Sequence, residues 1–466
     1  MTMALPNRPK NFWLLQVFKW LSDPVGYMET TAKEYGDIFI SPVVVNLGEV
    51  VFISNPQGLQ TILSNPQKFP ASGNLNKTLE PLLGSNSVIM LDGEEHKTRR
   101  KLLLPPFHGE RMHTYGQLIC DITKNVTSQW TVNQPFTIRD TVQKIAMRVI
   151  FSTVFGLHNR PHYRQLQELL SARLKATSSP LSASLIFFPF LAKDYGDWSP
   201  GAKINRHQKQ MDELLYAEIR DRRAEGESDR NDILSLLLSA RDENGEGMSD
   251  EELRDELITL LVGAYENTAT GLAWAFYWIH RLPEVKDKLL AEIDSLGENP
   301  DPMSLFQLPY LTAVWQETLR IYPVGVLTLP RLVQESVEVE GKYLEAGTII
   351  FPCVHLLHQR EELYPEPKKF KPERFLERQF SPYEYIPFGA GARRCIGAAL
   401  AEFEMKLVLA TILKQYQLEL ADSRPVKPQR RGLALEPAGG VKMILKGDRI
   451  SEEKPLAGLK RKIRAK

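Results

Sequence analysis

One stretch of the chain, Leu257 to Ile279, is apolar except for a single charged residue, Glu266. A helix of about 20 apolar residues is long enough to cross a bilayer. However, Glu266, Asn267 and Thr268 lie in its middle, where a carboxylate is costly to insert. The preceding segment Ser249-Asp-Glu-Glu252 is a capping box that starts a helix. The pattern therefore predicts a helix of about 30 residues through the centre of the protein, and no transmembrane anchor.

The rest of the chain alternates between helical patterns and short strand-like runs. The predicted helices cover Glu284 to Leu296, Leu311 to Tyr322 and Ile396 to Tyr416. The predicted strands cover Ile38 to Ile40, Val43 to Asn46, Val50 to Ile53, Ser336 to Val339 and Thr348 to Val354. Prolines and glycines make Pro365 to Arg394 irregular, as functional segments often are. Since no linker divides these elements, we predict a mainly α fold with a minor β-sheet region in one large domain.

Composition and the two ends narrow the class of protein. The chain has 466 residues, 43% of them hydrophobic, and 58 basic residues nearly balance 57 acidic ones. This balance argues against nucleic acid or an anionic membrane as the main partner. Residues 1–22 are interrupted by basic residues and too short for a signal or an anchor, so we expect a cytoplasmic protein. Residues 23–445 form the predicted domain, and 446–466 form a basic tail.

Three cysteines, Cys120, Cys353 and Cys395, lie too far apart for a disulfide framework or a zinc knuckle. Cys120 and Cys353 are interpreted as core residues. Cys395 differs, because a glycine-rich loop delivers it to a helix start beside Arg393 and Arg394. Free amides and these arginines favour a thiolate, and no Cys/His dyad is suggested nearby. Metal ligation is therefore favoured over nucleophilic attack, and the glycines let the backbone approach a flat group.

The pattern Phe388-x-x-Gly391-x-Arg393-x-Cys395-x-Gly397 resembles the haem-binding signature of the cytochrome P-450 family. The chain as a whole is most similar to its soluble bacterial, notably cyanobacterial, members. Glu317-x-x-Arg320 and Pro372-Glu-Arg-Phe375 follow the family's order. The resemblance spans about Asp23 to Leu445. It implies the cytochrome P-450 fold and haem b (iron protoporphyrin IX), with Cys395 as the iron ligand and Phe388, Gly391, Arg393 and Gly397 around the cofactor.

The resemblance also assigns charged residues around the haem. His96 and Arg100, on the helix that crosses the haem edge, and Arg331 would hold the propionates. Glu317 and Arg320, alone an ordinary surface pair, would join Arg374 in a buried network that fixes the loop of Cys395. Lys97, Arg99 and Lys101 are interpreted as a solvated helix face, with docking of an acidic electron donor as the alternative.

The central helix departs from the family pattern. Small residues Gly263 and Ala264 and the acid Glu266 are present, but Asn267 stands where the family has a threonine. Thr268 is one residue late, about 100° around the helix. An amide relays protons less readily than a hydroxyl. Three alternatives follow: Glu266 and water deliver protons, a local distortion of the helix brings Thr268 into the site, or oxygen activation has been abandoned.

The leading hypothesis is a monooxygenase that inserts one atom of O₂ into a C–H bond of a lipophilic substrate, of the fatty acid, alkane or terpenoid class. The pocket-lining segments by resemblance, Leu79 to Met90, Leu181 to Leu191 and Val324 to Leu329, are apolar. Residues 185–191 are either a mobile lid or core. We find no reductase segment, so ferredoxin and ferredoxin reductase are expected as separate electron donors. The protein is expected to be a monomer. The alternative is a donor-independent hydroperoxide isomerase or dehydratase, and a haem-bound sensor ranks last.

Overall fold

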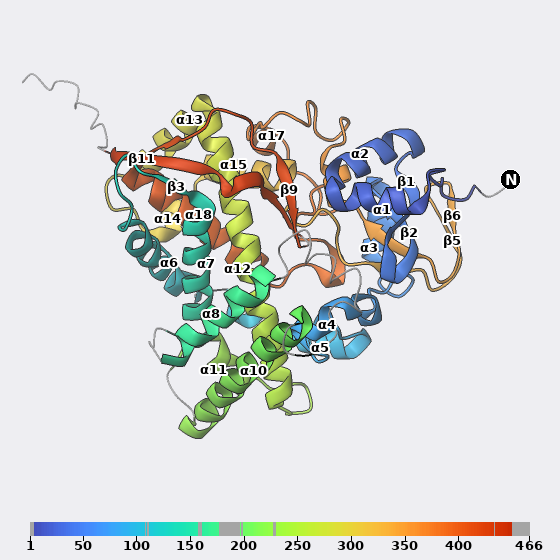
Figure 1. Cartoon of the computed structure of the whole chain (residues 1–466), viewed down its shortest axis with the longest axis horizontal. Helices are drawn as coiled ribbons and strands as arrows, with labels where there is room; N and C mark the ends of the chain where they lie inside the picture. Colours follow the sequence, from blue (N-terminus) through green and yellow to red (C-terminus); the bar gives the residue numbers. More distant parts are fainter. Residues whose placement is uncertain are drawn as a thin grey trace, which may run out of the picture.

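The fold is built around one long helix, α12 (Asp250–Arg281), in the computed structural model (Figure 1). The structure describes residues 4–107, 109, 111–156, 161–176, 196, 199–226, 230–432 and 434–449. The predicted capping box is confirmed: Ser249 accepts from the Glu252 amide, and Glu252 accepts from the Ser249 amide. Most of the helix is buried, including Trp274 and Phe276 at 0% exposure. The prediction of a central buried helix is confirmed.

Helices surround α12 and pack their apolar faces into one core. Those in direct contact with it include α4 (Glu80–Leu83), α7 (Ile138–Phe155), α10 (Pro200–Glu225), α11 (Ile233–Ser239), α13 (Pro283–Asp294), α15 (Pro309–Ile321) and α18 (Ala398–Gln415). Further helices are α3 (Pro56–Ser64), α5 (Gly93–Leu103), α6 (Arg111–Thr127), α8 (Pro161–Ala176), α14 (Pro302–Phe306), α16 (Val354–His358) and α17 (Arg374–Glu377). Within the described residues no helix is long and apolar enough to cross a membrane.

Small sheets lie beside the helical core. The largest has the order β1 (Ile38–Val44), β2 (Gly48–Ile53), β7 (Ile349–Pro352) and β4 (Arg331–Leu332), with β2 parallel to β7. A second has the order β3 (Pro135–Thr137), β11 (Lys442–Asp448) and β8 (Tyr416–Leu420). Two hairpin-like pairs join β5 (Val337–Val339) to β6 (Lys342–Leu344), and β9 (Pro428–Arg431) to β10 (Ala434–Pro437). The mainly α architecture with a minor β region is confirmed.

The structure refines several predicted boundaries. The strand predicted to end at Val354 stops at Pro352, and α16 follows it at once. The predicted tail begins inside β11, because this strand continues to Asp448 and Arg449 pairs with Asp294. The predicted lead-in contains α1 (Trp13–Ser22), which precedes α2 (Pro24–Tyr35) and packs on β1. Residues 13–22 of the predicted lead-in and 446–449 of the predicted tail therefore contribute to the folded domain.

Candidate functional site

The cysteine loop, residues 387–397, folds back on itself just before α18. Gly389 and Gly391 adopt φ values of +68° and +67°, which favour glycine. A Cβ on Gly391 would lie 2.2 Å from the carbonyl oxygen of Leu63, so this close approach needs a residue without a side chain. The amide of Cys395 donates to the carbonyl of Phe388 at 2.9 Å. The loop therefore holds Cys395 at a fixed place at the start of α18.

Cys395 is an exposed thiol that lines a pocket of about 310 Å³, together with Arg100, Arg394 and Glu402. Desolvation by the surrounding protein raises its pKa, while the Gly397 amide, Arg100 and Arg394 lower it. The sequence predicted that nearby arginines would favour the thiolate, but desolvation is the larger effect. A bound metal ion deprotonates a coordinating thiol outright. The environment of Cys395 thus suits a ligand that becomes a thiolate when metal is present.

Behind this loop, Glu317 and Arg320 form a fully buried pair on α15, as predicted. Arg320 donates from Nε and Nη2 to the two carboxylate oxygens at 2.6 and 2.9 Å. Arg374 joins them through Nε at 3.2 Å from Glu317 Oε1. Arg320 Nη1 also donates to the carbonyl of His358, whose Nε2 accepts from the Ile386 amide at 3.0 Å. The network therefore reaches the residues that enter the cysteine loop, and the predicted structural role is confirmed.

A cluster of cationic side chains lies beside the cysteine loop. Desolvation and the nearby charges of Arg393, Arg100 and Arg331 lower the pKa of buried His96 to about 4, while the charge of Asp92 acts in the opposite direction. Arg331 is 5% exposed and donates to the carbonyls of Leu329 and Pro330 at 2.8 and 3.2 Å. Its pKa is lowered to about 10 by burial. Among the described residues no carboxylate pairs with Arg331 or Arg100, whereas Arg393 pairs with Asp92 at 3.2 Å.

Buried cations without anionic partners are costly. The cluster therefore fits a cofactor that brings its own carboxylates, and the two propionates of a haem meet this requirement. Gly397 has open space where a Cβ would stand, so the backbone leaves room for a flat group. No group of three or more His, Cys, Asp and Glu side chains in the described part of the chain is arranged to hold a bare metal ion. A metal carried inside a cofactor, with Cys395 as its protein ligand, fits this site best.

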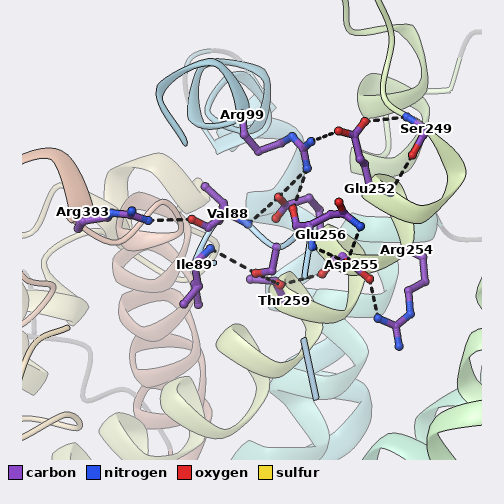
Figure 2. A network of polar contacts seen from close by, with 12 residues as sticks. Val88, Ile89, Arg99, Ser249, Glu252, Arg254, Asp255, Glu256, Thr259 and Arg393 are labelled. Carbon is purple, nitrogen blue, oxygen red and sulfur yellow. Dashed lines mark hydrogen bonds and ion pairs between the residues drawn. The ribbon is translucent and has the colours of Figure 1, made fainter. Parts of the chain in front are cut away.

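The guanidinium of Arg393 forms hydrogen bonds with other parts of the protein. It donates to the carbonyls of Ala71 and Val88 at 2.7 and 2.9 Å, and it also bonds Leu91 and Asp92. A contact of Arg393 with the cofactor stays a prediction. Its guanidinium fastens residues 88–92, which precede α5, to the cysteine loop, and Figure 2 shows the bond to Val88.

The same segment is fastened to α12 from its other side. Glu256 accepts from the Val88 amide at 2.8 Å, and Asp255 accepts from the Asn86 amide at 2.8 Å. Arg99 of α5 completes this connection by bonding Glu252 and Glu256 (Figure 2). Arg99 is 7% exposed, so its predicted place on a solvated helix face is wrong. Lys97 and Lys101 are exposed, as predicted.

The central helix presents Asn267, not Thr268, to open space. Asn267 and Gly263 are exposed although their neighbours on α12 are buried or half-buried, and no atom lies within 4 Å of a Cβ built on Gly263. Asn267 Nδ2 donates to the Gly263 carbonyl at 2.8 Å, and its side-chain oxygen accepts no hydrogen bond from the described residues. Thr268 is 3% exposed. The helix is regular through this region, so the local distortion weighed above is absent between residues 250 and 281.

Glu266 faces a charged network on the other side of α12. Its Oε2 lies 2.5 Å from Arg139 Nη2, and its Oε1 accepts from Gln143 at 2.8 Å. Arg139 Nε in turn lies 2.7 Å from Glu436, and Arg431 lies beside both acids. Sequence reasoning missed these partners, because they lie more than 120 residues from Glu266 in the chain and no local pattern marks them.

Apolar side chains of the predicted pocket-lining segments are partly buried. Leu79, Ile89, Met90 and Val324, from two of the predicted lining segments, are partly buried against the main core, as is Ala264 of α12. The third predicted segment, Leu181 to Leu191, lies outside the described residues. Half-exposed apolar groups in these segments suit a lipophilic ligand.

A cysteine on a glycine-rich loop, beside Arg100, which has no carboxylate partner among the described residues, is the arrangement of a haem-thiolate protein. A profile of the Cytochrome P450 family matches residues 6–443. The Mycobacterium tuberculosis protein named cytochrome P450 135B1 is 33% identical over 450 residues, which cover 96% of this chain and 93% of that protein. The chain belongs to the cytochrome P450 family, whose members are haem-dependent monooxygenases.

Other relatives agree. Cytochrome P450 138 of Mycobacterium tuberculosis is 31% identical over 421 residues, covering 89% of this chain and 90% of that protein. A retinoic-acid-bound cyanobacterial CYP120A1 structure superposes with a TM-score of 0.82 at 22% identity, over 96% of this chain and 100% of that one. The cytochrome P450DA haem domain gives 0.83 at 21% identity, over 96% and 99%. These two likenesses show the fold alone.

Proposed function

We propose that the protein inserts one oxygen atom of O₂ into a C–H bond of a lipophilic substrate of the fatty acid, alkane or terpenoid class. The observation that carries this proposal is the placement of Cys395 beside Arg100, in a cluster where neither Arg100 nor Arg331 pairs with a carboxylate of the described residues. Haem, when bound, supplies the oxygen-activating redox chemistry. In this proposal Cys395 ligates the iron, Arg100 and Arg331 neutralise the propionates, and His96, neutral at pH 7, donates a hydrogen bond to one of them. Phe388, Gly391 and Gly397 shape the backbone around the cofactor.

Residues of α12 would handle the oxygen and the protons. The Asn267 amide, tied to Gly263 through Nδ2, offers its side-chain oxygen as a hydrogen-bond acceptor for an ordered water. Glu266 would pass protons only after its carboxylate separates from Arg139 and Gln143. Thr268 is buried and takes no part in this proposal. Proton transfer thus depends on water held by Asn267 or on movement of Glu266.

This arrangement also favours a second candidate, the donor-independent isomerisation or dehydration of a hydroperoxide. Such a reaction starts from an O–O bond already present in its substrate, so it needs no proton relay for O₂. Asn267 in place of a hydroxyl, with Glu266 held in an ion network, is the observation that favours it. The two candidates differ in their need for electrons, which we propose come from ferredoxin and ferredoxin reductase in the first case.

The test incubates the haem-loaded protein with fatty acids and with their hydroperoxides under ¹⁸O₂, with and without a ferredoxin system. Mass spectrometry of the products separates the candidates. The proposal predicts an ¹⁸O-labelled alcohol that forms only with the electron donors. Unlabelled product from the hydroperoxide, formed without donors and with no alcohol in the other arm, would overturn it in favour of the second candidate.

A further inference from the structure

Large apolar side chains are exposed mainly at one place on the protein. Of the eight that are exposed among the described residues, six lie between residues 5 and 18. Five of these belong to α1 and the residue before it, and we name them the N-terminal apolar surface: Phe12 (66% exposed), Trp13 (47%), Leu14 (49%), Leu15 (47%) and Phe18 (67%). An apolar cluster of this kind usually marks an interaction site.

Helix α1 is already attached to the protein by its opposite face. Gln16, Val17 and Trp20 are buried, and the Trp20 ring contacts the rings of Tyr27 and Phe52. At 100° per residue, Leu14, Leu15 and Phe18 fall within about 100° of one another on the outer face. A helix that is apolar on both faces is normally buried on both. Here the outer face of α1, at the N-terminal end of the molecule (Figure 1), has no covering segment among the described residues.

The chain segment that carries this surface has a positive net charge. Residues 1–22 contain Arg8, Lys10 and Lys19 and no acidic residue, although the whole chain is nearly neutral. Arg8 pairs with Glu49 at 2.6 Å. Lys10 and Lys19 are exposed and form no ion pair with any described residue. Apolar and aromatic side chains flanked by free lysines are the composition of helices that lie in the interface of an anionic membrane.

We propose that the N-terminal apolar surface binds the surface of an anionic lipid bilayer, with α1 lying in the plane of the interface. The helix has 10 residues, about 15 Å, so it cannot cross a hydrocarbon core of about 30 Å. A second copy of the chain is the weaker candidate, since a symmetric contact would bring the lysines of both copies together. Bilayer binding would place the protein where lipophilic molecules concentrate, and it does not depend on the proposed reaction.

The test measures co-sedimentation of the haem-loaded full chain with vesicles of phosphatidylcholine and of phosphatidylcholine with phosphatidylglycerol. The wild type is expected to bind the anionic vesicles, and more weakly at high salt. The double variant Leu14→Ser/Phe18→Ser is expected to lower the partition coefficient about tenfold or more. The matched control is Val132→Ser/Leu376→Ser, which removes the two exposed apolar side chains that lie outside residues 5–18 and should bind as the wild type does.

The vesicle and sedimentation results together support or overturn bilayer binding. An unchanged haem spectrum shows that the variants are folded, since none of the four positions lies in the cysteine loop or the cation cluster. Failure of the wild type to bind either vesicle would overturn the proposal, as would equal binding by Leu14→Ser/Phe18→Ser. Sedimentation velocity without lipid is the third arm: a wild-type dimer that Leu14→Ser/Phe18→Ser abolishes would assign the surface to a second copy instead.

Discussion

The buried carboxylate of Glu317 should be among the most sensitive positions for stability. Its two oxygens accept four hydrogen bonds: two from Arg320, at 2.6 and 2.9 Å, one from the Lys371 amide at 2.8 Å and one from Arg374 at 3.2 Å. Glu317→Gln keeps the shape of the side chain but removes its charge. Two arginines then remain at 0% and 6% exposure without their shared anion.

The expected loss is large in relation to the stability of a folded protein. Removing one partner of a buried ion pair costs about 3–5 kcal/mol, because the other charge stays desolvated. Typical total stabilities are about 5–15 kcal/mol. Glu317→Gln is therefore expected to remove a substantial part of the free energy of unfolding, and to loosen the cysteine loop through His358 and Ile386.

The assay is guanidinium denaturation of the haem-loaded protein, followed by tryptophan fluorescence and by haem absorbance. The control is Glu94→Gln, which removes the acid of Glu94–Lys97, a pair of the same i,i+3 spacing on the protein surface. Exposed pairs contribute little, so this variant should unfold as the wild type does. If Glu317→Gln unfolds at the same denaturant concentration as Glu94→Gln, the reasoning from burial is refuted.

Three further predictions concern pH, cofactor retention and coupling. Burial, with Arg320 nearby, holds the pKa of His358 well below its ordinary value. Below about pH 6.5 this histidine is protonated in the unfolded chain but not in the folded protein. The free energy of unfolding should therefore fall as the pH is lowered, by up to about 1.4 kcal/mol per pH unit. His358→Gln should show a shallower slope in denaturation series from pH 7 to 5, and an equal slope would contradict this. The Arg331→Met variant should transfer its haem to apomyoglobin at a higher rate than the wild type. An unchanged transfer rate would exclude a contact between Arg331 and a haem propionate. Asn267→Thr should raise the fraction of consumed electrons recovered in product, and no gain would point to Glu266 and water.

Local sequence patterns predicted the parts of the protein that depend on neighbouring residues. The capping box at Ser249 and the apolar run after it placed α12, because helix starts and burial are encoded within a few turns. The glycine spacing around Cys395 indicated the loop, because its unusual φ values require those residues. Haem as cofactor and the pairing of Glu317 with Arg374 came from the family resemblance.

Contacts between distant segments were beyond the reach of the same reasoning. Arg99 resembled a solvated residue because its helix is basic, but its partners Glu252 and Glu256 come from α12, over 150 residues later. Glu266 is likewise held by Arg139 of α7. Only the packing of these helices brings the charges together, and no spacing of residues in the sequence indicates which helices pack against each other.

The central claim, that Cys395 is the iron ligand, is tested most directly by the absorption spectrum of the reduced, CO-bound protein. The prediction is the red-shifted band of thiolate-ligated haem in the wild type, its loss in Cys395→Ser, and its retention in the buried-cysteine control Cys120→Ser. A Cys395→Ser protein that keeps this band would contradict the assignment, and so would its loss in Cys120→Ser alone.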